Sequence, residues 1–231
     1  MGALNILVFG RNIYIAGARA NPAHFFNGGD LAAHTNAYAA KNGIKLTSVN
    51  LILKTFDCAL RFEKLPDLSD RDLRGYIDNN LNEYFPMPLI GYTVSYRRWP
   101  DGDGAFVCLA AAPDELTLPY IEIFSQLKIK INKIDIFQNA SADFLKNENA
   151  ALVALKKGDH INATLVRNGR PEAARDVHSD GELTVFARMH GLEADNISIC
   201  AADCESDFIS EFLPGYAIRK IDCAELVAAY G

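Results

Sequence analysis

The stretch LPDLSDRDLRGYIDNNLNEYFPMP, residues 65–88, decides the predicted fold. Ser69 stands where an N-cap residue is expected, and Asp72 three residues later completes a pair of the capping-box type. Pro86 and Pro88 end the helical pattern, because proline lacks the backbone N–H that a helix needs. Between these ends the apolar residues recur at helical spacing: Leu73, Tyr76, Ile77, Leu81 and Tyr84. The stretch therefore predicts an amphipathic helix over residues 70–84.

Strand and turn signals continue on both sides of this helix. A continuous apolar run at 49–53 predicts a strand covered on both faces. Pro119 leaves the start of the second helix open, with Thr117 as an alternative N-cap. The elements expected after residue 88 are strands at 90–99 and 105–111 around a loop at 100–104, a helix from Pro113 to about Leu127, and a strand at 128–136. The stretch Val49–Leu145 thus predicts an α/β insert with two helices.

The two flanks each open with a hairpin signal. Gly10 and Asn12 separate apolar runs at 4–9 and 12–18, and Asn168-Gly169 is typical of a type I′ turn. Asp30 is expected to cap a helix that ends at Asn42-Gly43. The remaining expected elements are strands at 23–27, 150–156, 161–167, 172–177, 196–200 and 217–221, and helices at 181–190, 205–213 and 224–230.

Composition narrows the class of protein. The chain has 231 residues, 49% of them hydrophobic, and a formal net charge of −6. This length can bury a sizeable core in one domain or in two small ones. The acidic balance argues against non-specific binding of nucleic acid or anionic lipid, because both need a basic excess. No apolar run approaches the roughly 20 residues of a membrane span, and no secretory signal is recognised. A membrane segment beyond Gly231 in a longer parent protein stays open.

The five cysteines indicate a reducing compartment. Those that fall in strand patterns, Cys58 and Cys108, are interpreted as small core residues. A metal site could be drawn from Cys200, Cys204, Cys223 and His190. Their spacing matches no familiar zinc pattern, so the sequence predicts no metal site.

The order of these elements resembles one family, PilM and GspL, the actin-like cytoplasmic proteins of type IV pilus and type II secretion machines. The segments that match its pattern are Leu65-Pro66, Ser69–Tyr84, Phe85-Pro86-Met87-Pro88, Ser95-Tyr96, Leu109–Ala112, Ile134-Asp135-Ile136 and the C-terminal Ile221–Gly231. The resemblance implies an α/β, actin-like (ribonuclease-H-like) two-lobed fold with a small inserted α+β domain. It implies the start of the first lobe at 1–53, the insert at 54–130, and the end of the first lobe with a reduced second lobe at 131–231.

The departures from actin-like ATPases bear on function. Such ATPases place an Asp and a Gly-Ser/Thr-rich turn between the first two strands of each lobe, where they handle metal and phosphate. Here the first turn keeps only Gly10, and Val8 offers no carboxylate. In the second lobe the Asp and Gly positions fall on Ala154 and Lys156. We therefore expect no catalytic residues and no cofactor, although Asp159 could restore ATP binding if the strand register differed.

Two exposed segments are candidate surfaces. Tyr96, Arg97, Arg98 and Trp99 form an aromatic and basic cluster that is either a partner-binding edge or an ordinary strand end. The segment Tyr84–Pro88 is either an apolar platform or a packed helix stop. Asp101 to Gly104 lacks the later ligands of a calcium loop, which favours a solvated turn.

These expectations combine into a non-enzymatic scaffold, cytoplasmic and peripheral to the bacterial inner membrane. By resemblance its partners are the cytoplasmic tail of a membrane platform protein and/or the assembly ATPase, with a homodimer left open. One alternative is a PilM-like, ATP-binding actin-fold protein. A further alternative is the cytoplasmic part of a longer membrane protein.

Overall fold

The computed structural model describes residues 2–17, 23–54, 58–193 and 198–230. The chain divides into two compact units, one built from 1–55 with 121–231 and the other from 56–120. Each is described by itself. The ends of two predicted strands, residue 18 and residues 196–197, lie outside the described residues. The predicted insert range of 54–130 remains a prediction beside the observed 56–120 unit.

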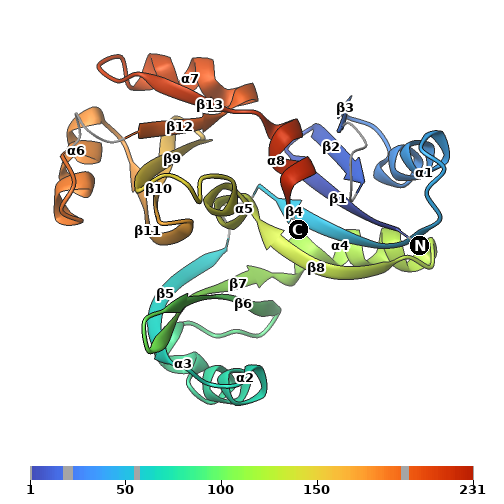
Figure 1. The fold of residues 1–231 in the computed structure, drawn as a ribbon, viewed down its shortest axis with the longest axis horizontal. Coiled ribbons are helices and arrows are strands. Elements are labelled where there is room, and N and C mark those ends of the chain that lie inside the picture. The colour runs from blue at the N-terminus through green and yellow to red at the C-terminus, as the bar shows by residue number, and fades with distance from the viewer. Residues whose placement is uncertain (1, 18–22, 55–57, 194–197, 231) are drawn as a thin grey trace. The chain divides into compact units, whose positions relative to one another are not determined.

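The first sheet of the larger unit is built largely from the opening of the sequence. Its strands are β1 (Gly2–Phe9), β2 (Asn12–Gly17), β3 (His24–Asn27), β4 (Leu46–Leu53) and β8 (Lys130–Ile136). They lie in the order β3-β2-β1-β4-β8, with β1, β2 and β3 antiparallel and β4 and β8 added in parallel (Figure 1). Gly10 makes the first turn with φ of +63°. Asp30 caps α1 (Leu31–Lys41), as the sequence predicts.

The second sheet repeats this plan. Its strands are β9 (Ala150–Lys157), β10 (His160–Arg167), β11 (Arg170–Val177), β12 (Ser198–Ala202) and β13 (Ile218–Ile221). They lie in the order β11-β10-β9-β12-β13, again with three antiparallel strands followed by two parallel ones. Asn168 and Gly169 form the predicted turn with φ of 50° and 75°. The helical elements after it are α6 (Asp180–Met189), η2 (Asp203–Glu205) and α7 (Ser206–Phe212).

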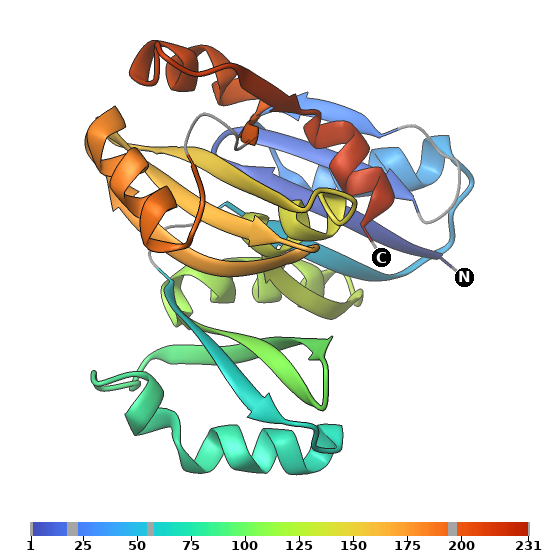
Figure 2. The ribbon, with the colours of Figure 1, turned by 60° about the vertical axis from the view of Figure 1, so that its left-hand side comes forward.

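Two further helices connect the sheets of the larger unit. They are α5 (Phe137–Phe144) and α8 (Cys223–Ala229). Although α8 comes last in the chain, it returns to the first sheet and packs on β1 and β2 (Figures 1 and 2). The Asn5 side-chain amide fixes it, donating to the carbonyl of Val227 at 3.1 Å and to that of Tyr230. The buried side-chain amide of Asn5 therefore holds the C-terminal helix against the first sheet.

Asp135 is a second buried anchor of the same helix. Its carboxylate accepts hydrogen bonds from the Tyr230 hydroxyl at 2.6 Å and the Asn139 amide at 2.8 Å. Lys133 lies 2.8 Å from it. Burial alone would raise the pKa of the Asp135 carboxyl, but Lys133 and these hydrogen bonds together lower it. The carboxylate thus ties β8, α5 and the C-terminal residues together.

The smaller unit is a three-stranded antiparallel sheet with helices on one face. Its strands are β5 (Ala59–Pro66), β6 (Tyr92–Asp101) and β7 (Gly104–Pro113), in the order β5-β7-β6. Helices α2 (Asp70–Asn79) and α3 (Leu81–Tyr84) cover it, and α4 (Asp114–Gln126) continues into the larger unit. The fully or almost fully buried core residues are Leu65, Leu73, Ile77, Phe85, Ala105, Val107, Leu109 and Ala111. Phe85 is in this core, so the Tyr84–Pro88 segment is a packed helix stop.

One local prediction in this region is wrong in detail, and two are confirmed. The helix expected over 70–84 breaks at Asn80, whose side-chain amide donates to the Tyr76 carbonyl at 2.6 Å and so competes with helical hydrogen bonds. The connection expected at 100–104 is the hairpin turn that the sequence favours, in which Gly102 adopts φ of +62° and Asp101 pairs with Gly104. The helix expected to follow Pro113 and run to about Leu127 spans Asp114–Gln126, so its start is as predicted and not at the alternative cap Thr117, and Pro119 lies inside it.

Candidate functional site

The two turns that would bind phosphate in an actin-like ATPase carry no suitable carboxylate. The side chains at the expected positions, Val8 and Ala154, are both apolar, and Ala154 is fully buried. Asp159 lies in the second turn with its side chain 99% exposed, where its carboxylate is 3.0 Å from His160 Nδ1. The hydrogen bond from His160 lowers the pKa of Asp159. Asp159 is thus a solvated turn residue paired with its own neighbour.

The carboxylate of Glu205, a residue outside the second turn, lies beside that turn. Its Oε2 accepts a hydrogen bond at 2.9 Å from the backbone N–H of Lys156, at the end of β9. Its Oε1 pairs with Lys54, which follows β4 of the first sheet, and both side chains are nearly nine-tenths buried. The Lys54 ammonium also lies 4.4 Å from the centre of the Phe9 ring. A backbone N–H that could cradle phosphate is therefore already bonded to an internal anion that bridges the two sheets.

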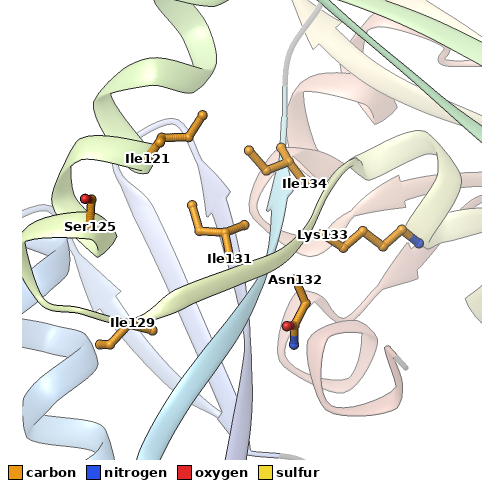
Figure 3. A pocket seen from close by; sticks show the side chains of 7 residues that line it. All are labelled: Ile121, Ser125, Ile129, Ile131, Asn132, Lys133 and Ile134. Carbon is orange, nitrogen blue, oxygen red and sulfur yellow. The ribbon is translucent and has the colours of Figure 1, made fainter.

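A groove lies between α4 and β8 of the larger unit, with a cavity volume of about 480 Å³. The residues that line it are Ile121, Ser125, Ile129, Ile131, Asn132, Lys133 and Ile134 (Figure 3). Figure 3 shows Ile121, Ile131 and Ile134 turned toward the same space. β8 ends the order of its sheet, so one side of it is an edge. An apolar groove beside a strand edge can accept an extended peptide, which would pair with the backbone and place side chains in the groove.

A β-bulge shapes this groove. Ile131 pairs with Val49 and Lys133 with Asn50, so Asn132 is an extra residue in β8. In a regular strand, residues three apart point to opposite faces. The extra residue shifts the alternation of side chains by one position, so that Ile131 and Ile134 lie on the same face of the strand and both face the groove. The sequence shows the isoleucines but not the bulge, because the bulge exists only in the pairing with β4.

The predicted partner-binding cluster on β6 separates onto two faces of its sheet. Arg98 donates to the Leu68 carbonyl at 2.9 Å and pairs with Asp70 at 3.1 Å, so it anchors the start of α2. Tyr96 packs against the helix-covered core. Arg97 lies over the Trp99 ring, 5.1 Å from its centre, and belongs to the other face. The structure does not bring the four side chains together on one surface.

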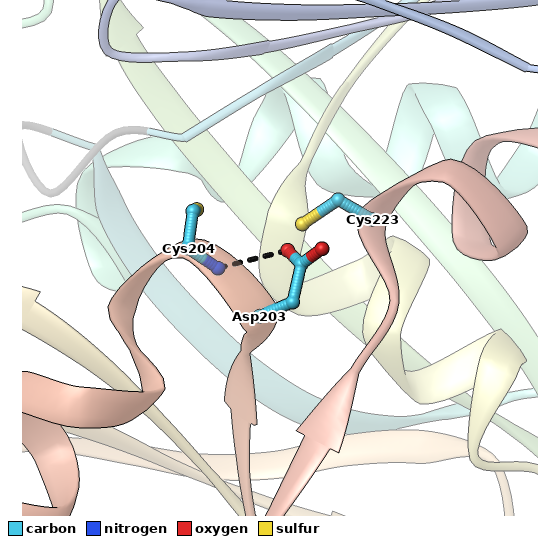
Figure 4. Close-up of side chains that lie close together, drawn as sticks. All are labelled: Asp203, Cys204 and Cys223. Atoms are coloured by element: carbon cyan, nitrogen blue, oxygen red, sulfur yellow. Dashed lines mark hydrogen bonds between the residues drawn. The ribbon is translucent and has the colours of Figure 1, made fainter.

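Cysteine residues meet at the carboxyl ends of β12 and β13. The carboxylate of Asp203 and the thiols of Cys204 and Cys223 lie within 4.8 Å of one another (Figure 4). A hydrogen bond from Cys223 lowers the pKa of the Cys204 thiol, and sharing that proton raises the pKa of Cys223. Burial and the nearby Cys223 raise the pKa of the Tyr14 phenol.

The other two members of the cysteine and histidine set considered from the sequence lie apart from this cluster. Cys200 contacts Ser198 at 3.6 Å, and His190 packs edge-on against Phe186 at 5.0 Å. Sequence reasoning missed Asp203. The signal that could have found it is the Asp-Cys pair that follows each of the two parallel strands, Asp203-Cys204 and Asp222-Cys223.

Two sheets with the same strand order, joined through α5 and α8, define an actin-like fold, which confirms the fold class predicted from the sequence. A chain of a PilM-PilN type IV pilus biogenesis complex is similar over 98% of this chain and 90% of its own length, with a TM-score of 0.67 and 13% identity. The cytoplasmic domain of EpsL, an inner membrane component of the type II secretion system of Vibrio cholerae, is similar over 99% and 93%, with a TM-score of 0.56 and 12% identity.

A third similar structure is a Bacteroides thetaiotaomicron protein with an actin-like ATPase fold and unknown function. It covers 96% of this chain and 91% of its own length, with a TM-score of 0.55 and 9% identity. No family model and no curated protein sequence matches the chain. The predicted resemblance to PilM and GspL is thus confirmed in the fold. Within the described residues, no helix is both long enough and apolar enough to cross a membrane.

Proposed function

We propose that this protein is a non-enzymatic scaffold of a type IV pilus or type II secretion platform, acting on the cytoplasmic side of the bacterial inner membrane. The observation that carries the proposal is the fold shared with a chain of a PilM-PilN type IV pilus biogenesis complex and with the cytoplasmic domain of EpsL. The absence of a carboxylate at Val8 and Ala154 and the internal anion Glu205 support a role without nucleotide chemistry.

The groove between α4 and β8 is the proposed binding site for the cytoplasmic tail of a membrane partner. Its four isoleucines would contact apolar side chains of an extended segment, and the edge of β8 would pair with the backbone of that segment. Lys130, an exposed residue of β8, favours a segment with acidic residues. The assembly ATPase is a second proposed partner, and Arg97 with Trp99 on the smaller unit is a second proposed surface.

The test is a titration of this protein into a fluorescently labelled peptide that spans the cytoplasmic tail of the PilN-type protein from the same genome. We expect saturable binding, weakened at least tenfold by Ile131→Asp or Ile134→Asp, because a charge would be buried in the groove. The matched control is Ile90→Asp, at a position 94% exposed, which should bind as the wild type does. Equal affinity of the groove variants and the control would contradict the proposed site.

The alternative, an ATP-binding actin-fold protein, is separated by calorimetric titration with magnesium and ATP. We expect no heat of binding at millimolar ATP, because Glu205 already accepts the Lys156 N–H and no turn carboxylate is placed for magnesium. A binding isotherm that disappears in Asp159→Ala would favour the alternative.

A further inference from the structure

We propose that Asp203, Cys204 and Cys223 form a binding site for a thiophilic divalent cation of the zinc class. Their three ligand atoms lie within 4.8 Å of one another. In a tetrahedral zinc site with two thiolates and a carboxylate, these atoms stand roughly 3.5–3.8 Å apart. Small side-chain rotations would therefore bring the three atoms from their observed spacing to that of a zinc site, without movement of the backbone.

The topology of the second sheet explains why these side chains meet. β12 and β13 are parallel neighbours, with Ala202 paired to Ile221, so their carboxyl ends share one edge of the sheet. Asp203 and Cys204 follow β12, and Cys223 begins α8 directly after β13. Ligands that come from two adjacent strand ends are held at a fixed separation by the sheet itself.

Local hydrogen bonds orient the ligands. Asp203 Oδ1 accepts from the Cys204 backbone N–H at 2.9 Å, which fixes the position of the carboxylate. Asp222 Oδ1 accepts from the backbone N–H groups of Ala224 and Glu225 at 2.8 and 3.0 Å, and so fixes the first turn of α8 that carries Cys223. Figure 4 shows the Cys223 sulfur directed toward the Asp203 carboxylate. These contacts provide the outer support that metal ligands require.

The chemistry of the donor set selects the class of cation. Two sulfur donors disfavour magnesium and calcium, which prefer oxygen ligands, and favour zinc-like ions. Three protein ligands leave a fourth tetrahedral position for water. Cys204 is exposed, so an ion can reach the cluster from solvent.

The experiment is a titration of the reduced, metal-stripped full chain with Co²⁺, followed by near-ultraviolet absorption of sulfur-to-cobalt charge transfer. We expect the band to saturate at one Co²⁺ per chain and to disappear when Zn²⁺ is added. Cys204→Ser should reduce the band to half or less, and Asp203→Asn should weaken Co²⁺ binding at least tenfold. Cys58→Ser, a cysteine outside the cluster, is the matched control and should leave the band unchanged.

Thermal unfolding gives a second readout. Zn²⁺ should raise the melting temperature of the wild type and of Cys58→Ser but not of Cys204→Ser, because a ligand that binds only the folded state stabilises it. Because Cys223 is buried, its replacement could disrupt folding, and the test therefore rests on the exposed Cys204. The proposal is overturned if the reduced chain takes up no Co²⁺, or if Cys204→Ser retains the full band.

Discussion

At the scale of the residue, the contacts of Asp135 explain why the Ile134-Asp135-Ile136 segment carries a buried carboxylate. It is 6% exposed, and its carboxylate meets Lys133, Asn139 and Tyr230. A buried carboxylate is tolerated only when its charge and lone pairs are satisfied. Here the partners come from β8, α5 and the C-terminal residues, so one side chain coordinates three parts of the larger unit.

The lowered pKa of Asp135 predicts a stability that depends on pH. Its partners hold the folded-state pKa below the ordinary value of 3.8, so the unfolded chain binds a proton first as the pH falls. The contribution is complete above about pH 4 and is lost as the pH drops through the folded-state pKa. Asp135→Asn should lower the free energy of unfolding at pH 7 by about 1–3 kcal/mol.

Urea unfolding between pH 7 and pH 3 measures this effect. The variant should lose less stability than the wild type over the acidic end of that range, because it no longer carries the titrating group. Parallel curves for the two proteins would show that Asp135 does not contribute to the acid sensitivity. Asp103→Asn is the control, because Asp103 is an exposed residue of the hairpin turn between β6 and β7.

Glu205 is the residue that sequence reasoning could not place. In the sequence it is one acidic residue of a polar helical segment. Only the folded chain brings it to the Lys156 N–H and to Lys54, which lies 151 positions away in the chain. Its role depends on long-range contacts that no local pattern encodes.

At the scale of the element, local sequence signals correctly predicted most of the helices, strands and turns and where they begin or end. Ser69 caps α2 through the Asp72 N–H, Asp30 caps α1, and Asn168-Gly169 makes the predicted turn. Each of these features is decided by atoms within a few residues of one another. The error at Asn80 arose because its side-chain amide competes with the backbone for the Tyr76 carbonyl.

The bulge in β8 belongs to the same scale but has a different origin. Asn132 is displaced because β8 must pair with β4 and also place Ile131 and Ile134 in the groove. Pairing register is a property of two strands, so neither strand's sequence reveals it. The residues of the groove were therefore found only in the structure.

At the scale of the whole molecule, the two compact units predict separable unfolding. Phe85 is fully buried in the core of the smaller unit, and its replacement by alanine should cost that unit about 3–5 kcal/mol. Trp99, the single tryptophan of the chain, lies in the same unit and reports on it alone. In Phe85→Ala, the fluorescence transition in denaturant should move to lower concentration, while the main far-ultraviolet circular dichroism transition should stay near its wild-type midpoint.

A core variant of the larger unit is the matched control for that measurement. Ile209→Ala, also fully buried, should shift the circular dichroism transition and leave the Trp99 transition in place. If either variant moved both transitions equally, the two units would unfold as one cooperative block, contrary to this prediction.

The sequence by itself determined most of the elements, their caps and turns, the actin-like plan through its family resemblance, and the lack of a carboxylate at positions 8 and 154. These are properties of neighbouring residues or of their order along the chain. The tertiary structure alone decided the Glu205 bridge, the bulge that forms the β8 groove, the separation of Tyr96 and Arg98 from Arg97 and Trp99, and the meeting of Asp203, Cys204 and Cys223. The physical reason is the same throughout: each depends on strand register or on contacts between residues distant in the chain, which are fixed only when the sheets assemble.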